Sequence, residues 1–123
     1  MLHFLLNQIN IIMKGLKNNI EEEALKNENF RKVLYSGEHL QVVLMSLKPG
    51  EEIGMESNVG TNQFFRFEAG NGKCIIDGNE YKVKNGDALN APAGTNRNVI
   101  NTDSENELKM YTIYSPPIAL TNL

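Results

Sequence analysis

Polar and aromatic side chains with a two-residue spacing lie between residues 56 and 67. Glu56 and Asn58 are two residues apart, and so are Gln63, Phe65 and Phe67. Side chains two apart on a β-strand point to the same face of a sheet. Strands through these positions would present polar groups and an aromatic wall, formed by Phe65 and Phe67, to one side. This pattern is typical of a pocket for a small polar molecule.

The remaining reactive side chains are isolated. His39 precedes the apolar run 40–45, and a lone histidine at such a place is usually a surface or hydrogen-bonded residue. Cys74 has no histidine nearby in sequence and is more typical of a small packed hydrophobe than of a nucleophile. Because it is the only cysteine, an intrachain disulfide and a zinc site built on sulfur are excluded. We therefore expect a reducing, cytoplasmic setting.

The charge distribution argues against nucleic acid as a partner. The chain of 123 residues has 12 Lys and Arg against 15 Asp and Glu, a formal net charge of −3. Its three arginines, Arg31, Arg66 and Arg97, are scattered and form no basic stripe that could neutralise a run of phosphates. The length and the 41% hydrophobic content fit one ordinary globular domain.

The first twelve residues are apolar but lack the features of a signal peptide or a membrane span. No Lys or Arg precedes the apolar run, and polar residues interrupt it. It is also shorter than the roughly 20 residues that a membrane-spanning helix needs. We therefore predict no membrane association and interpret residues 1–15 as a flexible or gene-model extension.

The elements that position the pocket residues are predicted to be one short helix followed by strands. Asn19–Lys26 has a capping residue, an acidic first turn and a terminal lysine, so residues 16–29 are expected to form a helical lead-in. From Phe30 onward, short runs rich in β-branched and aromatic residues alternate with turn sequences. Asp77-Gly78 is the strongest hairpin signal, because a two-residue turn with positive φ favours glycine. The pattern predicts an all-β domain, either a sandwich or a closed barrel.

Two motifs in this strand region resemble the two motifs of the cupin family. The first lies in residues 50–70 and the second in residues 86–101. The matched positions are Gly50, Gly70, Gly86, Pro92, Gly94 and Asn101. The resemblance implies the cupin fold, a double-stranded β-helix or jelly-roll barrel, over residues 30–117. Residues 118–123 would then be a C-terminal tail.

The resemblance also indicates where family members hold a divalent metal ion, and there the sequence departs from the family. Position by position, the four metal ligands correspond to Glu56, Asn58, Gln63 and Arg97. Asn58 offers only a weak neutral oxygen, and Arg97 is a cation without an acceptor atom. We therefore expect no metal and no other cofactor, with an ion pair between Arg97 and Glu56 in place of the metal.

Three interpretations of Arg97 and Glu56 remain open. In the first, they bind a ligand together with Asn58 and Gln63. In the second, they are only a satisfied internal ion pair that fills an inactive barrel. In the third, Arg97 leaves the barrel and points into solvent, which would remove the only cation of the site.

The favoured function is that of a cupin-domain protein without a competent metal site, which binds a small polar or anionic molecule in its barrel. The alternative is an enzyme of the sugar isomerase or epimerase type, because small cupins are often described as resembling mannose-6-phosphate isomerase. That chemistry needs a Lewis acid, which Asn58 and Arg97 would not hold, so the sequence favours binding without deciding against catalysis. A homodimer is also expected, because Phe64 and alternate residues of 40–47 would give the sheet an apolar outer face.

Overall fold

The computed structural model describes residues 15–118, which form two β-sheets and one short helix. The strands are β1 (Arg31–Ser36), β2 (Gln41–Leu47), β3 (Glu56–Ser57), β4 (Asn62–Ala69), β5 (Asn71–Ile76), β6 (Asn79–Lys84), β7 (Ala88–Ala91), β8 (Asn96–Asn101) and β9 (Leu108–Ser115). One sheet has the strand order β1-β2-β9-β4-β7 and the other β3-β8-β5-β6. The predicted all-β jelly-roll class is confirmed.

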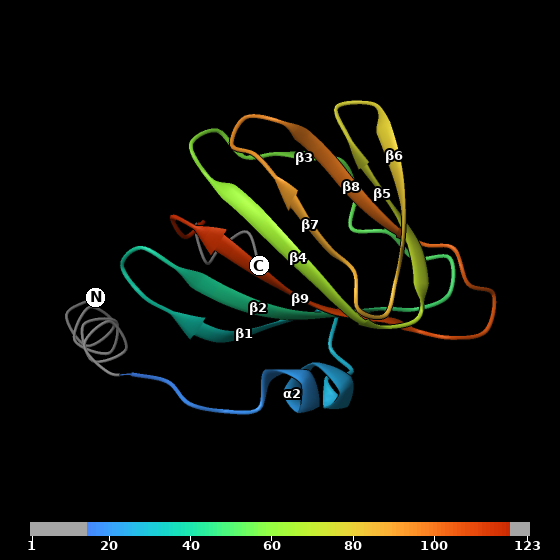
Figure 1. Ribbon diagram of the computed structural model, residues 1–123, viewed down its shortest axis with the longest axis horizontal. Coiled ribbons are helices and arrows are strands. Elements are labelled where there is room, and N and C mark those ends of the chain that lie inside the picture. Colours follow the sequence, from blue (N-terminus) through green and yellow to red (C-terminus); the bar gives the residue numbers. More distant parts are fainter. Residues whose placement is uncertain (1–14, 119–123) are drawn as a thin grey trace.

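The two sheets face each other and form a barrel with two different ends. Figure 1 shows that they converge where β4 leads into β5 and diverge at the other end, where β4 and β8 begin. The predicted N-terminal extension and C-terminal tail lie outside the described residues, apart from Gly15 and Ile118. Within the described part, no helix is both long enough and apolar enough to cross a membrane.

The two clearest local signals of the sequence form as predicted. Helix α2 (Ile20–Lys26) begins after Asn19, whose side chain accepts a hydrogen bond of 3.0 Å from the backbone N–H of Glu22. The β5–β6 hairpin turns at Asp77 and Gly78, whose φ angles are 47° and 81°. A two-residue hairpin turn of this kind requires positive φ, which explains the aspartate and glycine found there.

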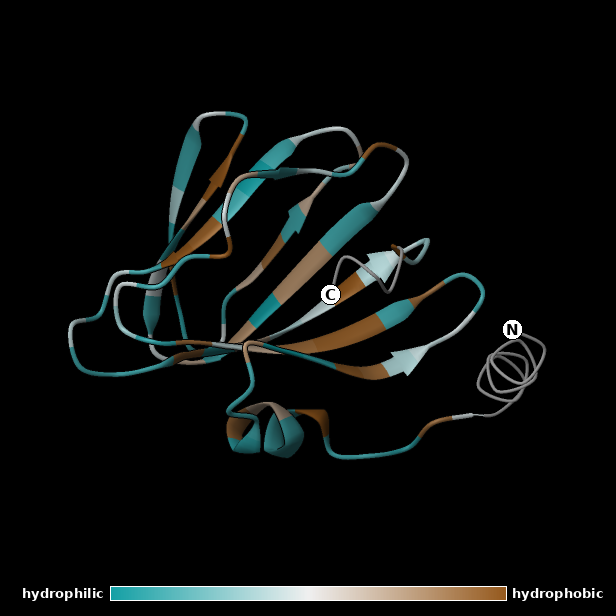
Figure 2. Ribbon diagram, turned by 180° about the vertical axis from the view of Figure 1, so that it is seen from behind, coloured by the Kyte–Doolittle hydropathy of each residue, from teal (hydrophilic) through white to brown (hydrophobic). Residues whose placement is uncertain are grey.

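Strand β2 is buried on both faces. Figure 2 shows it as a mostly hydrophobic strand, and all seven of its residues are buried. Its inward residues belong to the core: Val43, Met45 and Leu47. On the outer face, Val42 and Leu44 are 8% and 0% exposed, and α2 packs against β2, β4 and β9. Part of the apolar face expected to support dimerisation is thus covered within one chain, and the homodimer stays a prediction.

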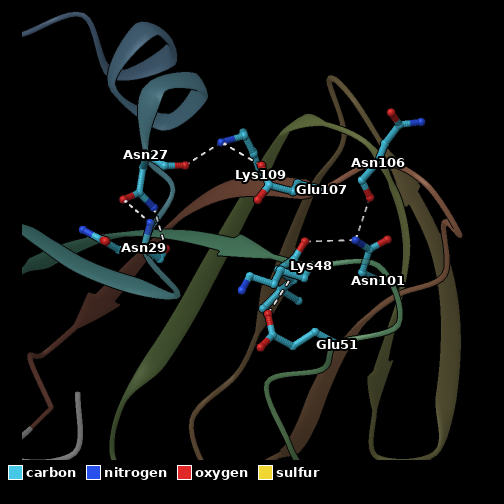
Figure 3. Close-up of polar contacts among 9 residues, drawn as sticks. Asn27, Asn29, Lys48, Glu51, Asn101, Asn106, Glu107 and Lys109 are labelled. Carbon is cyan, nitrogen blue, oxygen red and sulfur yellow. Dashed lines mark hydrogen bonds and ion pairs between the residues drawn. The ribbon is translucent and has the colours of Figure 1, made fainter.

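Asn101 and Gly70, two of the matched motif positions, lie at the convergent end of the barrel and make close contacts there. The side-chain amide of Asn101 donates to the carbonyl oxygens of Leu47, at 3.0 Å, and Asn106, at 2.9 Å (Figure 3). Gly70 has a φ of +91°, and a Cβ atom there would collide with the backbone carbonyl of Glu107. Asn101 and Gly70 therefore fix how closely the strands approach each other at this end.

Candidate functional site

Polar side chains from six strands face the interior of the barrel, most of them near its divergent end, and we call them the polar layer. They are Arg31, Gln41, Glu56, Gln63, Arg97 and Tyr114. In the five-stranded sheet, Tyr114 lies directly opposite Gln41 on one neighbouring strand and Gln63 on the other. Directly opposite residues of an antiparallel pair share a face of the sheet. In the four-stranded sheet, Glu56 is opposite Arg97.

Arg97 links the two sheets. Its side chain is 1% exposed, and its Nη1 donates to Gln63 Oε1 at 3.4 Å. Its Nη2 donates to the carbonyl oxygens of Pro92, at 3.1 Å, and Thr95, at 3.0 Å. All of these acceptors are neutral, and among residues 15–118 no carboxylate lies within ion-pair distance of Arg97. The interpretation in which Arg97 points into solvent is wrong.

Glu56 has a different partner from the predicted one. Its Oε1 lies 3.3 Å from Nη2 of Arg31, and the two side chains are 27% and 16% exposed. The expected ion pair between Arg97 and Glu56 is therefore wrong, although the two residues are opposite each other in the sheet. The reason is that β1, an edge strand of the opposite sheet, places a second guanidinium beside this carboxylate.

Burial decides the protonation states in the polar layer. It lowers the pKa of the Arg97 guanidinium, and the Glu56 carboxylate acts in the opposite direction. An arginine nevertheless remains charged at neutral pH. Burial, and after it the Glu56 carboxylate, raises the pKa of the Tyr114 phenol, which therefore keeps its proton. With two guanidinium groups and one carboxylate, the polar layer has a net charge of +1.

The other predicted pocket residues lie around or below the polar layer. Asn58 follows β3 and is half-buried, and among the described residues its Nδ2 has no hydrogen-bond partner. Phe65 and Phe67 face the interior as predicted, with ring centroids 6.3 Å apart. Cys74 is fully buried, and burial raises the pKa of its thiol to about 12. The interpretation of this cysteine as a packed hydrophobe is confirmed.

No local pattern in the sequence indicated Gln41 or Arg31 as members of this site. Gln41 is 0% exposed, and its position at the start of a run of mostly apolar residues was the only signal for it. Arg31 is 25 residues away from Glu56, so no local pattern indicated their contact. Tyr114 ends the last strand, where the sequence predicted that it lines either the pocket or an interface, and the structure places it beside Gln63 in the interior.

The polar layer does not fit the divalent metal ion that the family resemblance implies. A ligand atom must offer a lone pair, and the guanidinium of Arg97 offers none. Gln63 occupies another of the four metal-ligand positions. Its amide oxygen already accepts a hydrogen bond from Nη1 of Arg97. Within residues 15–118, no three His, Cys, Asp or Glu side chains come together in a group that could hold a metal. The residues at these four positions therefore do not fit a divalent metal ion.

Introducing histidines at positions 58 and 97 is expected to create a metal site. Asn58→His combined with Arg97→His would add two imidazoles to the Glu56 carboxylate and the Gln63 amide oxygen. We expect the double variant to bind Zn²⁺ or Ni²⁺ with a Kd in the micromolar range or below, measured by isothermal titration calorimetry. Equally tight binding by the unmodified protein at this site would contradict the argument.

The comparisons with known proteins agree with the geometry. A family model described as "Cupin domain" matches residues 43–114. The chain is 39% identical to BH2720 from Bacillus halodurans, whose crystal structure superposes with a TM-score of 0.84 over 87% of this chain and 85% of that one.

Two curated relatives are also similar to the chain. It is 42% identical over 105 residues to the uncharacterized protein YrkC of Bacillus subtilis, covering 80% of this chain and 56% of YrkC. It is 40% identical over 101 residues to the uncharacterized protein L612 of Acanthamoeba polyphaga mimivirus, covering 80% of this chain and 63% of L612. The chain thus spans less than two thirds of the length of either relative.

Proposed function

Since the chain belongs to the cupin family but has a buried guanidinium at a metal-ligand position, we propose that its barrel binds a small anionic molecule directly, without a metal ion. Arg97 carries this proposal. It is a charged group, 1% exposed, whose hydrogen-bond acceptors in the described part of the chain are all neutral. Burying a charge without a counter-charge is costly, and a bound anion would offset that cost.

The rest of the polar layer supports an anion more than a cation. Glu56 is paired with Arg31, so its charge is already balanced from the opposite sheet. Arg97 has no ion-pair partner within contact distance among the described residues, and Glu56 and Asp77 act on its charge only from farther away. Nε of Arg97 has no hydrogen-bond partner among the described residues, which leaves a charge-assisted donor for a carboxylate or phosphate oxygen. The protonated phenol of Tyr114 is a further hydrogen-bonding group in this layer.

Ligand-induced thermal stabilisation tests the proposal. The melting temperature, Tm, would be measured with a panel of small carboxylates and sugar phosphates. At a ligand concentration 100 times the Kd, binding adds about 2.7 kcal/mol of stability. For a domain of this size that corresponds to a rise in Tm of roughly 10 °C. We expect such a rise for the unmodified protein and none for Arg97→Met.

Two further variants separate a specific effect from a general one. Arg97→Lys keeps the charge but not the guanidinium geometry, so a reduced shift is expected. Lys82→Met removes a positive charge from an exposed position of β6 and should leave the shift unchanged. No response of the unmodified protein to any anion, or an undiminished shift in Arg97→Met, would overturn the proposal.

A further inference from the structure

A second buried polar group in the barrel is not explained by the anion alone. Gln41 is 0% exposed and is the direct neighbour of Tyr114, whose other neighbour in the sheet is Gln63. Because directly opposite residues share a face, Gln41 points into the same interior as Gln63. Two and four residues further along β2, Val43 and Met45 belong to the core, as the alternation of a strand requires.

The amide of Gln41 is only partly satisfied. Its Nε2 lies 3.5 Å from Ser36 Oγ, at the limit of a hydrogen bond, and its Oε1 has no partner among the described residues. A buried amide oxygen without a partner costs about 1–3 kcal/mol. Since the other inward residues of β2, Val43, Met45 and Leu47, are apolar, a partner supplied by a ligand would explain why an amide stands at this position.

From these observations we infer that the anion held by Arg97 also carries a hydroxyl group, and that Gln41 binds this hydroxyl. The inference rests on the proposed function, because it describes the other end of the same ligand. A hydroxyl can both donate and accept, so it matches either end of the Gln41 amide. Gln41 is then the residue that distinguishes a hydroxy acid from a simple carboxylic acid.

The strand geometry gives the length of such a ligand. Gln41 and Gln63 are two strands apart, a backbone separation of about 10 Å. Arg97 reaches Gln63 from the opposite sheet, so the anionic end lies near Gln63. A ligand that reaches from the Arg97 guanidinium toward Gln41 therefore needs several bonds between its anionic group and its hydroxyl group. A hydroxyl on the fourth carbon of an acid, as in 4-hydroxybutyrate or a sugar acid, provides such a chain.

A matched pair of ligands tests the inference. In pentanoate, a methyl group replaces the hydroxyl of 4-hydroxybutyrate while the length of the molecule is kept. The Kd of each would be measured by NMR titration with the unmodified protein and with Gln41→Met, which keeps the side-chain length. We expect the unmodified protein to prefer 4-hydroxybutyrate by tenfold or more, because a site with an unsatisfied buried amide rejects the analogue without a hydroxyl. Gln41→Met should bind both acids equally.

The outcomes separate this inference from the proposed function. If the unmodified protein binds both acids with equal affinity, the role of Gln41 is overturned while the anion site stands. A preference that persists in Gln41→Met would overturn it as well. If neither these two acids nor any anion of the panel binds, the proposed function falls and the inference falls with it. Gln41→Leu, which removes the unsatisfied amide, is a second variant should Gln41→Met fold poorly.

Discussion

Replacing Glu56 with leucine is expected to lower the free energy of unfolding by about 3 kcal/mol. The change removes the carboxylate that pairs with Arg31 and that also acts on the charge of Arg97. Removing one partner of a buried ion pair costs about 3–5 kcal/mol. We take the lower end of that range because the Glu56 side chain is 27% exposed. Urea denaturation followed by circular dichroism would measure the loss.

Two other variants show whether the loss comes from the buried charges. Adding Arg31→Met to Glu56→Leu removes the cation that pairs with Glu56 and should recover part of the lost stability. Glu80→Ala breaks the exposed ion pair with Lys73, in which Glu80 is 60% exposed, and should cost below about 1 kcal/mol. A loss as small for Glu56→Leu as for Glu80→Ala would show that the Arg31–Glu56 pair behaves as an ordinary surface pair.

Gly70→Ala is expected to destabilise the protein by about 4 kcal/mol. A side chain at positive φ alone costs roughly 1–2 kcal/mol. At Gly70, with φ of +91°, the new Cβ would also meet the backbone carbonyl of Glu107 and lie 3.0 Å from the Cα of Leu108. Backbone cannot move aside as a flexible side chain can, so the convergent end of the barrel must open.

Gly86→Ala is the matched control for this substitution. Gly86 has nearly the same φ, +94°, but a Cβ there would meet nothing within 4 Å. It should therefore cost only the conformational strain of about 1–2 kcal/mol. Similar melting temperatures for Gly70→Ala and Gly86→Ala would mean that the close approach of Glu107 has no energetic consequence. A lower value for Gly70→Ala alone would confirm that this glycine is required for strand approach.

Much of the fold could be predicted because its signals are local. The Asp77-Gly78 turn needs positive φ at both residues, and the sequence shows this without any tertiary information. The inward direction of Gln63, Phe65 and Phe67 follows from the two-residue period of a strand. Gly70 and Asn101 were recognised from their spacing in the motifs, and the structure gives both of them contacts at the convergent end.

The membership of the polar layer could be predicted only in part. Gln63 and Arg97 were identified and do meet, but β2 is buried on both faces and shows no alternation that would have revealed the direction of Gln41. The carboxylate of Glu56 was assigned to Arg97 because the two residues occupy two of the four metal-ligand positions that the family resemblance indicates. Its actual partner, Arg31, comes from the far edge of the other sheet.

The sequence by itself thus determined the strands, their turns, the face that each alternating strand turns inward, and the replacement of a metal ligand by a cation. These properties depend on residues within a few positions of one another. Only the tertiary structure decided which charges meet, because closing the barrel brings β1 to β3 and aligns Gln41 with Tyr114 across strands far apart in the chain. Side-chain pairing across a barrel depends on sheet order and register, and neither leaves a local pattern in the sequence.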